Sequence, residues 1–271
     1  MRKLSIITIN RNNTEGLRKT MESVFRQTYR DIEYIVIDGA STDGSVDIIK
    51  EFASKVSSGK SRVESFLWVS EPDRGVYEAM NKGIMKASGE YCLFLNSGDF
   101  LIAPDVIERV MKQCNGADIL CARCNVSDDG KVIWTSNPPE NITFGTLYTV
   151  GLAHQSTFIK RTLFDTCRLY QEDFRYNADI AFWYKTIIDN HATTQRIDVV
   201  TTDYNLDGIS SRENQSEQYK KEMEIILAPY AKFIPDYEEL LAHRREHVVL
   251  NWIKRHKMVY YMVKLLYKIG K

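Results

Sequence analysis

The chain has 271 residues, with 36 Lys or Arg against 36 Asp or Glu, so its formal net charge is zero. This balance argues against nucleic acid or another polyanion as the main partner. Apolar residues make up 44% of the chain and charged residues 27%, a composition that excludes disordered and collagen-like classes. The length fits one domain of about 200–250 residues with an appendage, or two small domains.

The sequence predicts a cytosolic protein. The apolar run that begins at Leu4 is soon interrupted by Thr8, Asn10 and Arg11, so no signal-peptide core is expected. The longest stretch without Asp, Glu, Lys or Arg, residues 141–159, contains four Thr, two Gly, a His and a Gln, so no transmembrane helix is expected either. The five cysteines include Cys121 and Cys124 without a second ligand pair for zinc, and we interpret all five as reduced, mostly buried thiols.

The first 95 residues alternate short β-branched runs with segments of helical periodicity. Leu4–Ile9 and Ile32–Ile37 are typical of buried strands, and Thr14–Tyr29 between them spaces its apolar residues as a helix does. This alternation predicts an α/β fold with a doubly wound, mostly parallel sheet flanked by helices. The next helices are expected at Asp43–Ser57 and Val76–Lys86, and the next strands at Val63–Val69 and Glu90–Leu95.

The pattern is less regular after residue 100. Ile119–Val126 and Lys131–Thr135 predict a hairpin around Asp128-Asp129-Gly130. Residues 137–159 predict a long loop, and loops of that length are usually functional. The remaining expectations are helices at Pro104–Cys114, Lys160–Thr166 and Asp179–Asn190, a strand at Ile197–Tyr204, and helices after a loop at Gly208–Ser211.

Polar residues follow each of the four predicted parallel strands. The carboxyl ends of such strands meet at one edge of an open sheet, which is where these folds bind ligands. Any one of these turns is explained better by ordinary turn chemistry, and Asp43 equally well by helix capping, but four together favour a ligand site. The turns are Thr8–Asn12, Asp38–Gly44, Glu71–Gly75 and Asn96–Asp99.

The sequence has no glycine-rich phosphate loop, because neither GxGxxG nor GxxxxGK[ST] occurs. A diphosphate at this edge therefore needs a bound cation to neutralise it. Asp99 is placed to hold Mg²⁺ or Mn²⁺ beside phosphate oxygens. Asp38, at the end of a buried strand, is placed to accept hydrogen bonds from a base or ribose.

Five stretches of the chain follow one another in an order and spacing that match a known protein family. The stretches are Ser5–Asn10, Ile35–Gly44, Asp73–Ile84, Ala87–Asp99 and His154–Phe158. They resemble the family two inverting nucleotide-sugar glycosyltransferases of the GT-A fold, closely those that assemble bacterial polysaccharides, and the resemblance runs from Leu4 to about Gly208. It implies a catalytic domain at 1–210, with a nucleotide-binding half at 1–100 and an acceptor half at 101–210, and a C-terminal helical region at 211–271.

The resemblance also implies which residues bind the donor. Asp99 would be the metal-binding member of the family's Asp-x-Asp motif, but here Asn96 and Gly98 replace its other two defining positions. Asp99 is then the only carboxylate, and we expect the metal to be held weakly, mainly through the donor's own diphosphate. Asn96 would still bond ribose or a metal-bound water. The nucleotide contacts implied are Thr8, Asn10, Asp38, Ser41, Asp73 and Asn96.

The stretch Tyr176–Lys185 resembles the segment that carries the family's catalytic base, with Asp179 in the base position and Ala178 in place of the usual preceding acid. A base is needed because an acceptor hydroxyl is a poor nucleophile until its proton is taken. Asp173 is a competing candidate. We favour Asp179, because it precedes an apolar helical run that would hold it rigidly, whereas Asp173 is typical of a solvated loop acid.

Four further residues are candidate donor or acceptor contacts. His154 and Gln155 match the family's His-Gln pair, where the histidine would contact phosphate or metal, or simply be a hydrogen-bonded loop residue. Tyr77 and Asn81 are expected on one helix face toward the donor, although core packing would explain Tyr77 equally well.

The resemblance implies an inverting transferase that moves a sugar from a nucleoside diphosphate sugar, most simply a UDP-sugar, to a hydroxyl of a glycan or lipid-linked acceptor in cell-surface polysaccharide biosynthesis. One rival is a sugar nucleotidyltransferase, which would need a glycine-rich loop where Asn10–Asn13 has none. The other is a nucleotide-sugar-binding scaffold that has lost catalysis. The Gln-x-x-Arg-Trp motif of processive synthases is absent from the sequence, which favours addition of single sugars.

The zero net charge hides a split. Residues 241–271 hold eight Lys or Arg and one Glu, a charge of +7, which leaves −7 for residues 1–240. This tail is also rich in apolar and aromatic residues, so residues 244–271 predict peripheral binding to an anionic membrane surface, on the inner face of the cytoplasmic membrane. The alternative is a helix packed on the domain or on a second copy of the chain.

Overall fold

The computed structural model describes residues 2–59, 63–128, 130–205, 216–256, 258–260 and 262–264. It divides into two compact units, Met1–Ile226 and Leu227–Lys271. The predicted domain boundary at 210–211 and the Gly208–Ser211 loop lie outside the described residues. The elements of the first unit are β1 (Leu4–Asn10), α1 (Thr14–Phe25), β2 (Ile32–Asp38), α2 (Ser45–Ser57), β3 (Ser65–Ser70), α3 (Val76–Lys86), β4 (Tyr91–Phe94), β5 (Phe100–Leu101), α4 (Val106–Gln113), β6 (Ile119–Asp128), β7 (Lys131–Thr135), α5 (Phe144–Thr149), η1 (His154–Ser156), β8 (Thr157–Lys160), α6 (Thr162–Cys167), α7 (Ala178–Trp183), the π-helix η2 (Tyr184–Asp189), β9 (Thr194–Asn205) and α9 (Glu217–Leu227).

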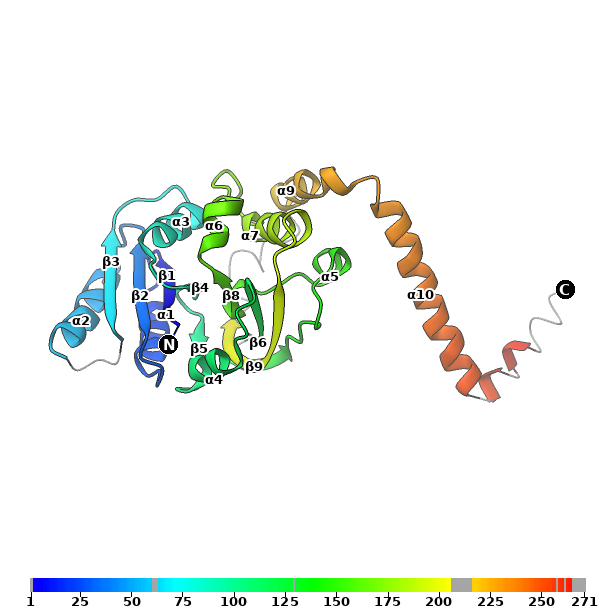
Figure 1. Ribbon diagram of the computed structural model, residues 1–271, viewed down its shortest axis with the longest axis horizontal. Helices are drawn as coiled ribbons and strands as arrows, with labels where there is room; N and C mark the ends of the chain where they lie inside the picture. Colours follow the sequence, from blue (N-terminus) through cyan, green and yellow to red (C-terminus); the bar gives the residue numbers. More distant parts are fainter. Residues whose placement is uncertain are drawn as a thin grey trace. The chain divides into compact units, whose positions relative to one another are not determined.

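The strands of the described residues form one sheet flanked by helices (Figure 1). Its order is β3-β2-β1-β4-β8-β6-β9-β5, with β7 paired to β6. The first four strands are parallel, as predicted. Helices cover both faces, so successive residues of β1 are all buried: Ile6 packs in the core with α1 and α2, while Ile7 meets α3 at Gly83. The predicted parallel first half of the sheet, with helices on both faces, is confirmed.

The second half of the sheet is mixed. β8 runs antiparallel to both β4 and β6, β6 and β9 are parallel, and β5 is antiparallel to β9. The hairpin of β6 and β7 is present as predicted, although Asp129 of its turn lies outside the described residues.

The long loop predicted at 137–159 is wrong. The segment contains α5 and the 3₁₀ turn η1, and its last residues begin β8. In the sheet, β8 is a central strand between β4 and β6. β8 has only four residues, Thr157–Lys160, which is too short for an alternation pattern. Its burial comes from the strands on either side. Because Lys160 is the last residue of β8, the helix expected to begin there begins at Thr162 instead.

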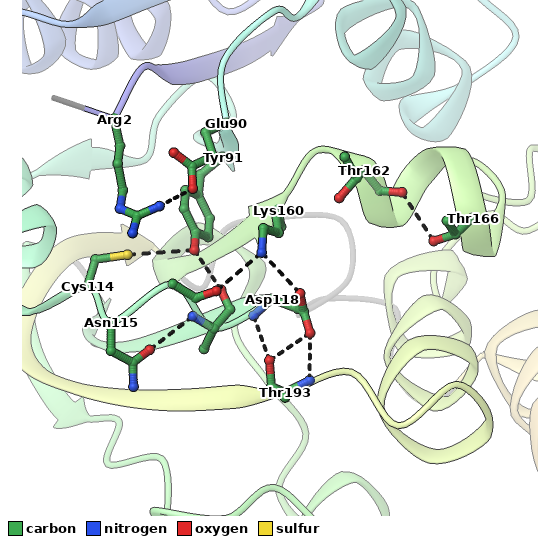
Figure 2. A network of polar contacts seen from close by, with 12 residues as sticks. Arg2, Glu90, Tyr91, Cys114, Asn115, Asp118, Lys160, Thr162, Thr166 and Thr193 are labelled. Atoms are coloured by element: carbon green, nitrogen blue, oxygen red, sulfur yellow. Dashed lines mark hydrogen bonds and ion pairs between the residues drawn. The ribbon is translucent and has the colours of Figure 1, made fainter.

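The amino-end edge of the sheet is closed by a polar network (Figure 2). Tyr91 Oη, at the start of β4, donates to Ala117 O at 2.6 Å. Lys160 Nζ, at the end of β8, lies 3.4 Å from Asp118 Oδ1, and Thr193 Oγ1 donates to Asp118 Oδ2 at 2.6 Å. These contacts fasten four strands at one edge and leave the polar turns at the opposite edge.

The five cysteines are free thiols, and burial raises the pKa of Cys92 and Cys121 to about 12. The prediction of mostly buried thiols is confirmed, since Cys114 is half-buried and the other four are buried. Among the described residues, no three His, Cys, Asp or Glu side chains are grouped so that they could hold a metal.

The second unit contains the helix α10 (Ile234–Arg255), after the one-turn η3 (Ala228–Tyr230). Every residue of α10 is described and none is buried. Val248 and Trp252 are more than half exposed, and so are Val249 and Leu250 beside them. In the described part of the chain, none of the helices has the length and apolarity that a membrane span requires.

Candidate active site

The turns after β1, β2 and β3 meet around the carboxylate of Asp38. In the parallel register, Asn10 is paired with Asp38 and Asp38 with Ser70. Asp38 Oδ1 accepts from Asn10 Nδ2 at 2.8 Å and from Ser41 Oγ at 2.6 Å. Asp38 Oδ2 accepts from Ser41 N at 2.9 Å and from Ser70 Oγ at 2.6 Å.

Asp38 is fully buried, and burial alone would raise its pKa, but the hydrogen bonds from Ser41, Ser70 and Asn10 outweigh it and hold the pKa below its usual range. A carboxylate has about four acceptor positions, and all are used here. A nucleotide would therefore meet Asp38 only by turning a serine hydroxyl away. The structure makes Asp38 the organiser of Asn10 and Ser41.

Asp73 lies against this cluster from the turn after β3. A Cβ on Gly39 would collide with the Asp73 carboxylate, so any larger residue at that position would push this side chain away from the cluster. Burial raises the pKa of Asp73, and the positive charges of Arg11 and Lys82 act against that rise. Asp43 lies at the outer side, where its carboxylate accepts from Ser45 N at 3.0 Å and Thr14 N at 2.9 Å and so fastens the starts of α2 and α1.

Thr8 is predicted as a nucleotide contact, but its side chain is fully buried. Its Oγ1 donates to Leu95 O at 2.7 Å and lies 3.0 Å from Tyr34 Oη. The hydroxyl therefore fixes the backbone that leads into Asn96.

The turn Asn96–Asp99 is held by Thr20 of α1. Thr20 Oγ1 donates to Asp99 O at 2.7 Å and accepts from Gly98 N at 2.9 Å. Gly98 has φ +110°, a left-handed conformation that favours glycine. The left-handed backbone conformation thus explains why glycine stands at position 98, where the motif usually has an acid. No sequence signal marks Thr20, which occupies an ordinary helix position.

Asp99 is 9% exposed, and no described side chain donates a hydrogen bond to its carboxylate. Burial raises its pKa to about 7, the negative charge of Asp203 on β9 adds to the rise, and His154 opposes it. A buried carboxylate that accepts only from a backbone N–H, here that of Asn96, is costly when charged, so a divalent cation with the donor's phosphate oxygens fits this position. Asp203 is a carboxylate that the sequence analysis missed, because only the pairing of Phe100 with Asp203 brings it here.

Asp179 and His154 come together across the site. His154 Nδ1 lies 3.3 Å from Asp179 Oδ2, and His154 Nε2 lies 3.3 Å from Asn96 Nδ2. Burial would lower the pKa of His154, but the hydrogen bond and charge of Asp179 and the charge of Asp99 raise it overall. His154 therefore links the candidate base to the turn that carries Asn96 and Asp99.

A protonated His154 would present an N–H to Asn96. Asn96 Oδ1 is buried and has no hydrogen-bond partner among the described residues. Turning the Asn96 amide over would give this oxygen the proton of His154 Nε2, so the pair accommodates either charge state of the ring.

Helix α3 supports the base from the other side. Tyr77 Oη donates to Tyr176 O at 2.6 Å and lies 3.0 Å from Asp179 Oδ1. Asn81 Nδ2 donates to Tyr170 O at 2.9 Å, and Asn81 Oδ1 accepts from Tyr170 N at 3.0 Å. Both side chains are buried. Tyr77 contacts the base, whereas the Asn81 amide is occupied by the backbone of Tyr170 and by Glu172 Oε1, to which Asn81 Nδ2 donates at 3.0 Å.

The other candidates are placed as follows. Gln155 is half-buried in η1, beside His154. Asp173 is exposed, which agrees with its interpretation as a solvated loop acid. Glu222 of α9, which the sequence analysis did not single out, is 1% exposed and accepts from the backbone just before α7. Its helix has no pattern that marks Glu222 apart from neighbouring acids.

Comparison with known proteins gives the family. The model for "Glycosyl transferase family 2" matches residues 5–175. The chain is 42% identical over 114 residues to an uncharacterized glycosyltransferase of Mycobacterium tuberculosis, a match that covers 42% of this chain and 40% of that protein. It is 30% identical over 211 residues to a PGL/p-HBAD biosynthesis glycosyltransferase of Mycobacterium bovis, covering 74% of this chain and 76% of that one.

Solved structures resemble the fold at low identity. The crystal structure of S. aureus TarS 1–349 in complex with UDP-GlcNAc is 17% identical, with a TM-score of 0.63, and the match covers 83% of this chain and 66% of that one. The mannosyltransferase PcManGT from Pyrobaculum calidifontis, in complex with GDP-Man and Mn²⁺, is 16% identical, with a TM-score of 0.55 over 73% of this chain and 56% of that one. The chain therefore belongs to glycosyl transferase family 2 and has the GT-A fold.

Proposed function

We propose that this protein transfers a sugar, with inversion, from a nucleoside diphosphate sugar to a hydroxyl of a glycan or lipid-linked acceptor. The main support is the pair of 3.3 Å contacts by which His154 joins Asp179 to Asn96, because they hold a half-buried, oriented carboxylate beside the donor-binding edge. A UDP-sugar is the simplest donor, given that TarS binds UDP-GlcNAc. The mycobacterial relative acts in PGL/p-HBAD biosynthesis, which favours a cell-surface glycan or glycolipid as product.

The donor would lie across the carboxyl ends of β1, β2, β3 and β4. Asn10, Ser41 and Asp73 would hold the base and ribose, while Asp38 and Thr8 keep that edge in shape through the bonds described above. Asn96 would bond the ribose or a metal-bound water. Asp99 would hold Mg²⁺ or Mn²⁺ with the diphosphate oxygens, where the cation neutralises the charge of the leaving group.

Transfer needs one displacement. The acceptor oxygen forms a bond to the anomeric carbon as the bond from that carbon to the diphosphate oxygen breaks, and the electron pair leaves with the diphosphate. Asp179 takes the acceptor proton, which contributes about 10²–10⁴-fold to the rate. Tyr77 and His154 hold one carboxylate oxygen each, so the base keeps its orientation without losing its free lone pairs.

The test compares Asp179→Asn with Asp173→Asn, a matched carboxylate substitution at an exposed position of the same segment. We expect Asp179→Asn to abolish sugar transfer and to leave UDP affinity unchanged by calorimetry, whereas Asp173→Asn keeps both. Transfer retained by Asp179→Asn would refute the base assignment. A wild-type protein that binds UDP-sugars but never consumes them would instead support the scaffold alternative.

We also propose that residues 244–271 bind an anionic membrane surface. The support is the basic excess of this region together with the exposure of Val248 and Trp252, which gives cationic and apolar contacts at once. Packing against a second copy of the chain is the competing outcome, and it would appear as a dimer in light scattering without lipid.

A further inference from the structure

Glu222 is a buried carboxylate that the mechanism above does not use. It lies on α9 with 1% of its surface exposed, and it accepts five hydrogen bonds. Oε1 accepts from Arg175 N at 2.7 Å and from Gln218 Nε2 at 2.9 Å. Oε2 accepts from Tyr176 N and Asn177 N, both at 3.0 Å, and from Asn177 Nδ2 at 3.3 Å.

Three consecutive backbone N–H groups thus converge on one carboxylate. Such runs of N–H groups form sites for anions, and here the anion is a side chain from another helix. The run ends at Asn177, the residue before α7, and Asp179 is the second residue of α7. The Asn177 side chain does not cap α7 but donates to Tyr219 O at 3.2 Å and to Glu222. Helix α9 therefore fixes the start of α7.

The same peptide segment is held from the opposite side by α3. Tyr77 Oη donates to Tyr176 O at 2.6 Å, while Glu222 accepts from Tyr176 N, so both backbone polar groups of Tyr176 have buried partners. These contacts set where the first turn of α7 begins, and hence where the Asp179 carboxylate points. A base works only when it is held within about 0.5 Å of its productive position.

We propose that Glu222 is a positioning residue for the base Asp179, acting through the backbone of residues 175–177. The inference rests on the proposed function, since it presumes that Asp179 takes the acceptor proton. The proposal gives α9 a role in positioning the base, although this helix lies outside residues 5–175, which the family model matches.

The test is Glu222→Gln, with Glu224→Gln as the matched control on the exposed side of α9. A glutamine keeps the shape of the side chain, but its NH₂ group replaces one acceptor oxygen and faces donors. We expect kcat to fall about 10- to 100-fold, because a displacement of about 1 Å costs that much. The KM for donor and the UDP affinity should stay within about twofold, since the donor edge is untouched. Glu224→Gln should match wild type.

A second readout is independent of turnover. Hydrogen exchange at the amides of residues 175–177 should become faster in Glu222→Gln and stay unchanged in Glu224→Gln. If Glu222→Gln does not fold, Glu222→Asp replaces it, because it keeps the charge while shortening the side chain.

Unchanged kcat in folded Glu222→Gln would overturn the proposal. So would losses of kcat and UDP affinity of equal size. Unchanged exchange at residues 175–177 would overturn it without any assay of transfer. A wild-type protein without transferase activity would count against the proposed function instead, and the exchange result would still report on the contact.

Discussion

Replacing Asp38 by Asn tests the idea that one buried carboxylate organises the donor edge. Either orientation of the new amide sets its NH₂ group against two donors of the present structure. If the NH₂ group takes the place of Oδ1, it faces Asn10 Nδ2 and Ser41 Oγ. If it takes the place of Oδ2, it faces Ser41 N and Ser70 Oγ. Either serine hydroxyl is able to rotate and accept. With the NH₂ group on the Oδ2 side, the Ser41 N–H is left without a partner. With the NH₂ group on the Oδ1 side, the Asn10 amide must turn over so that its Oδ1, which has no partner among the described residues, accepts the new hydrogen bond.

Hydrogen bonds to charged groups contribute about 1.5–3 kcal/mol each, and an unsatisfied buried donor costs about 1–3 kcal/mol. The loss of one charge-assisted bond therefore lowers the free energy of unfolding by about 1.5–3 kcal/mol. Because the pKa of Asp38 is lowered in the folded state, this advantage of the wild type is complete above the unfolded pKa of about 4 and is lost as the pH falls through the folded value.

Urea unfolding of Asp38→Asn at pH 7 and near pH 3 measures both effects. Asp47→Asn is the control, because Asp47 is an exposed acid on α2 whose side chain is 83% accessible. UDP affinity should fall in Asp38→Asn, since Asn10 and Ser41 lose their shared anchor, and stay unchanged in the control. If Asp38→Asn unfolds at the same urea concentration as Asp47→Asn, or if the difference persists unchanged at pH 3, the reasoning fails.

Four more outcomes follow from the site. Tyr77→Phe removes the hydroxyl that contacts Asp179 and Tyr176 and should lower kcat about fivefold, at about 1 kcal/mol for the lost hydrogen bond to the base, while calorimetry finds normal UDP affinity; weakened UDP binding would contradict this. Gly98→Ala must hold alanine at φ +110° and should cost about 1–2 kcal/mol in urea unfolding, so a neutral result would show that the turn relaxes. Mn²⁺-dependent UDP binding should weaken as the pH falls below about 7, because Asp99 is then protonated, and Asp99→Asn should remove that pH dependence. Since the raised pKa means that charged Asp99 destabilises the fold, Asp99→Asn should also unfold at a higher temperature than wild type at pH 8 and at nearly the same temperature at pH 4; an equal difference at both would refute the assignment.

Much of the nucleotide-binding half could be predicted from the sequence, because its signals are local. The strand runs and helix periods of the first 95 residues determine four parallel strands, and parallel strands necessarily bring their following turns to one edge. The contacts of Asn10 and Ser41 with Asp38 realise that convergence.

The acceptor half was harder to predict, because its contacts depend on long-range packing. β8 is central only because β4 and β6 flank it, and its four residues carry no period of their own. The meeting of His154 with Asp179 joins η1 to α7, and the Glu222 contacts join α9 to the residues before α7. No spacing pattern in the sequence predicts either of these contacts.

The most direct test of the central claim is the anomeric configuration of the released sugar. Proton NMR of wild-type protein with Mn²⁺ and α-linked UDP-GlcNAc, UDP-Glc or UDP-Gal, with water as acceptor, resolves the first anomer formed before it equilibrates. An inverting reaction with Asp179 as base predicts that the β-anomer appears first from one of these donors, and that Asp179→Asn, which still binds UDP, releases none. An α-anomer as first product, or hydrolysis undiminished in Asp179→Asn, would contradict the account.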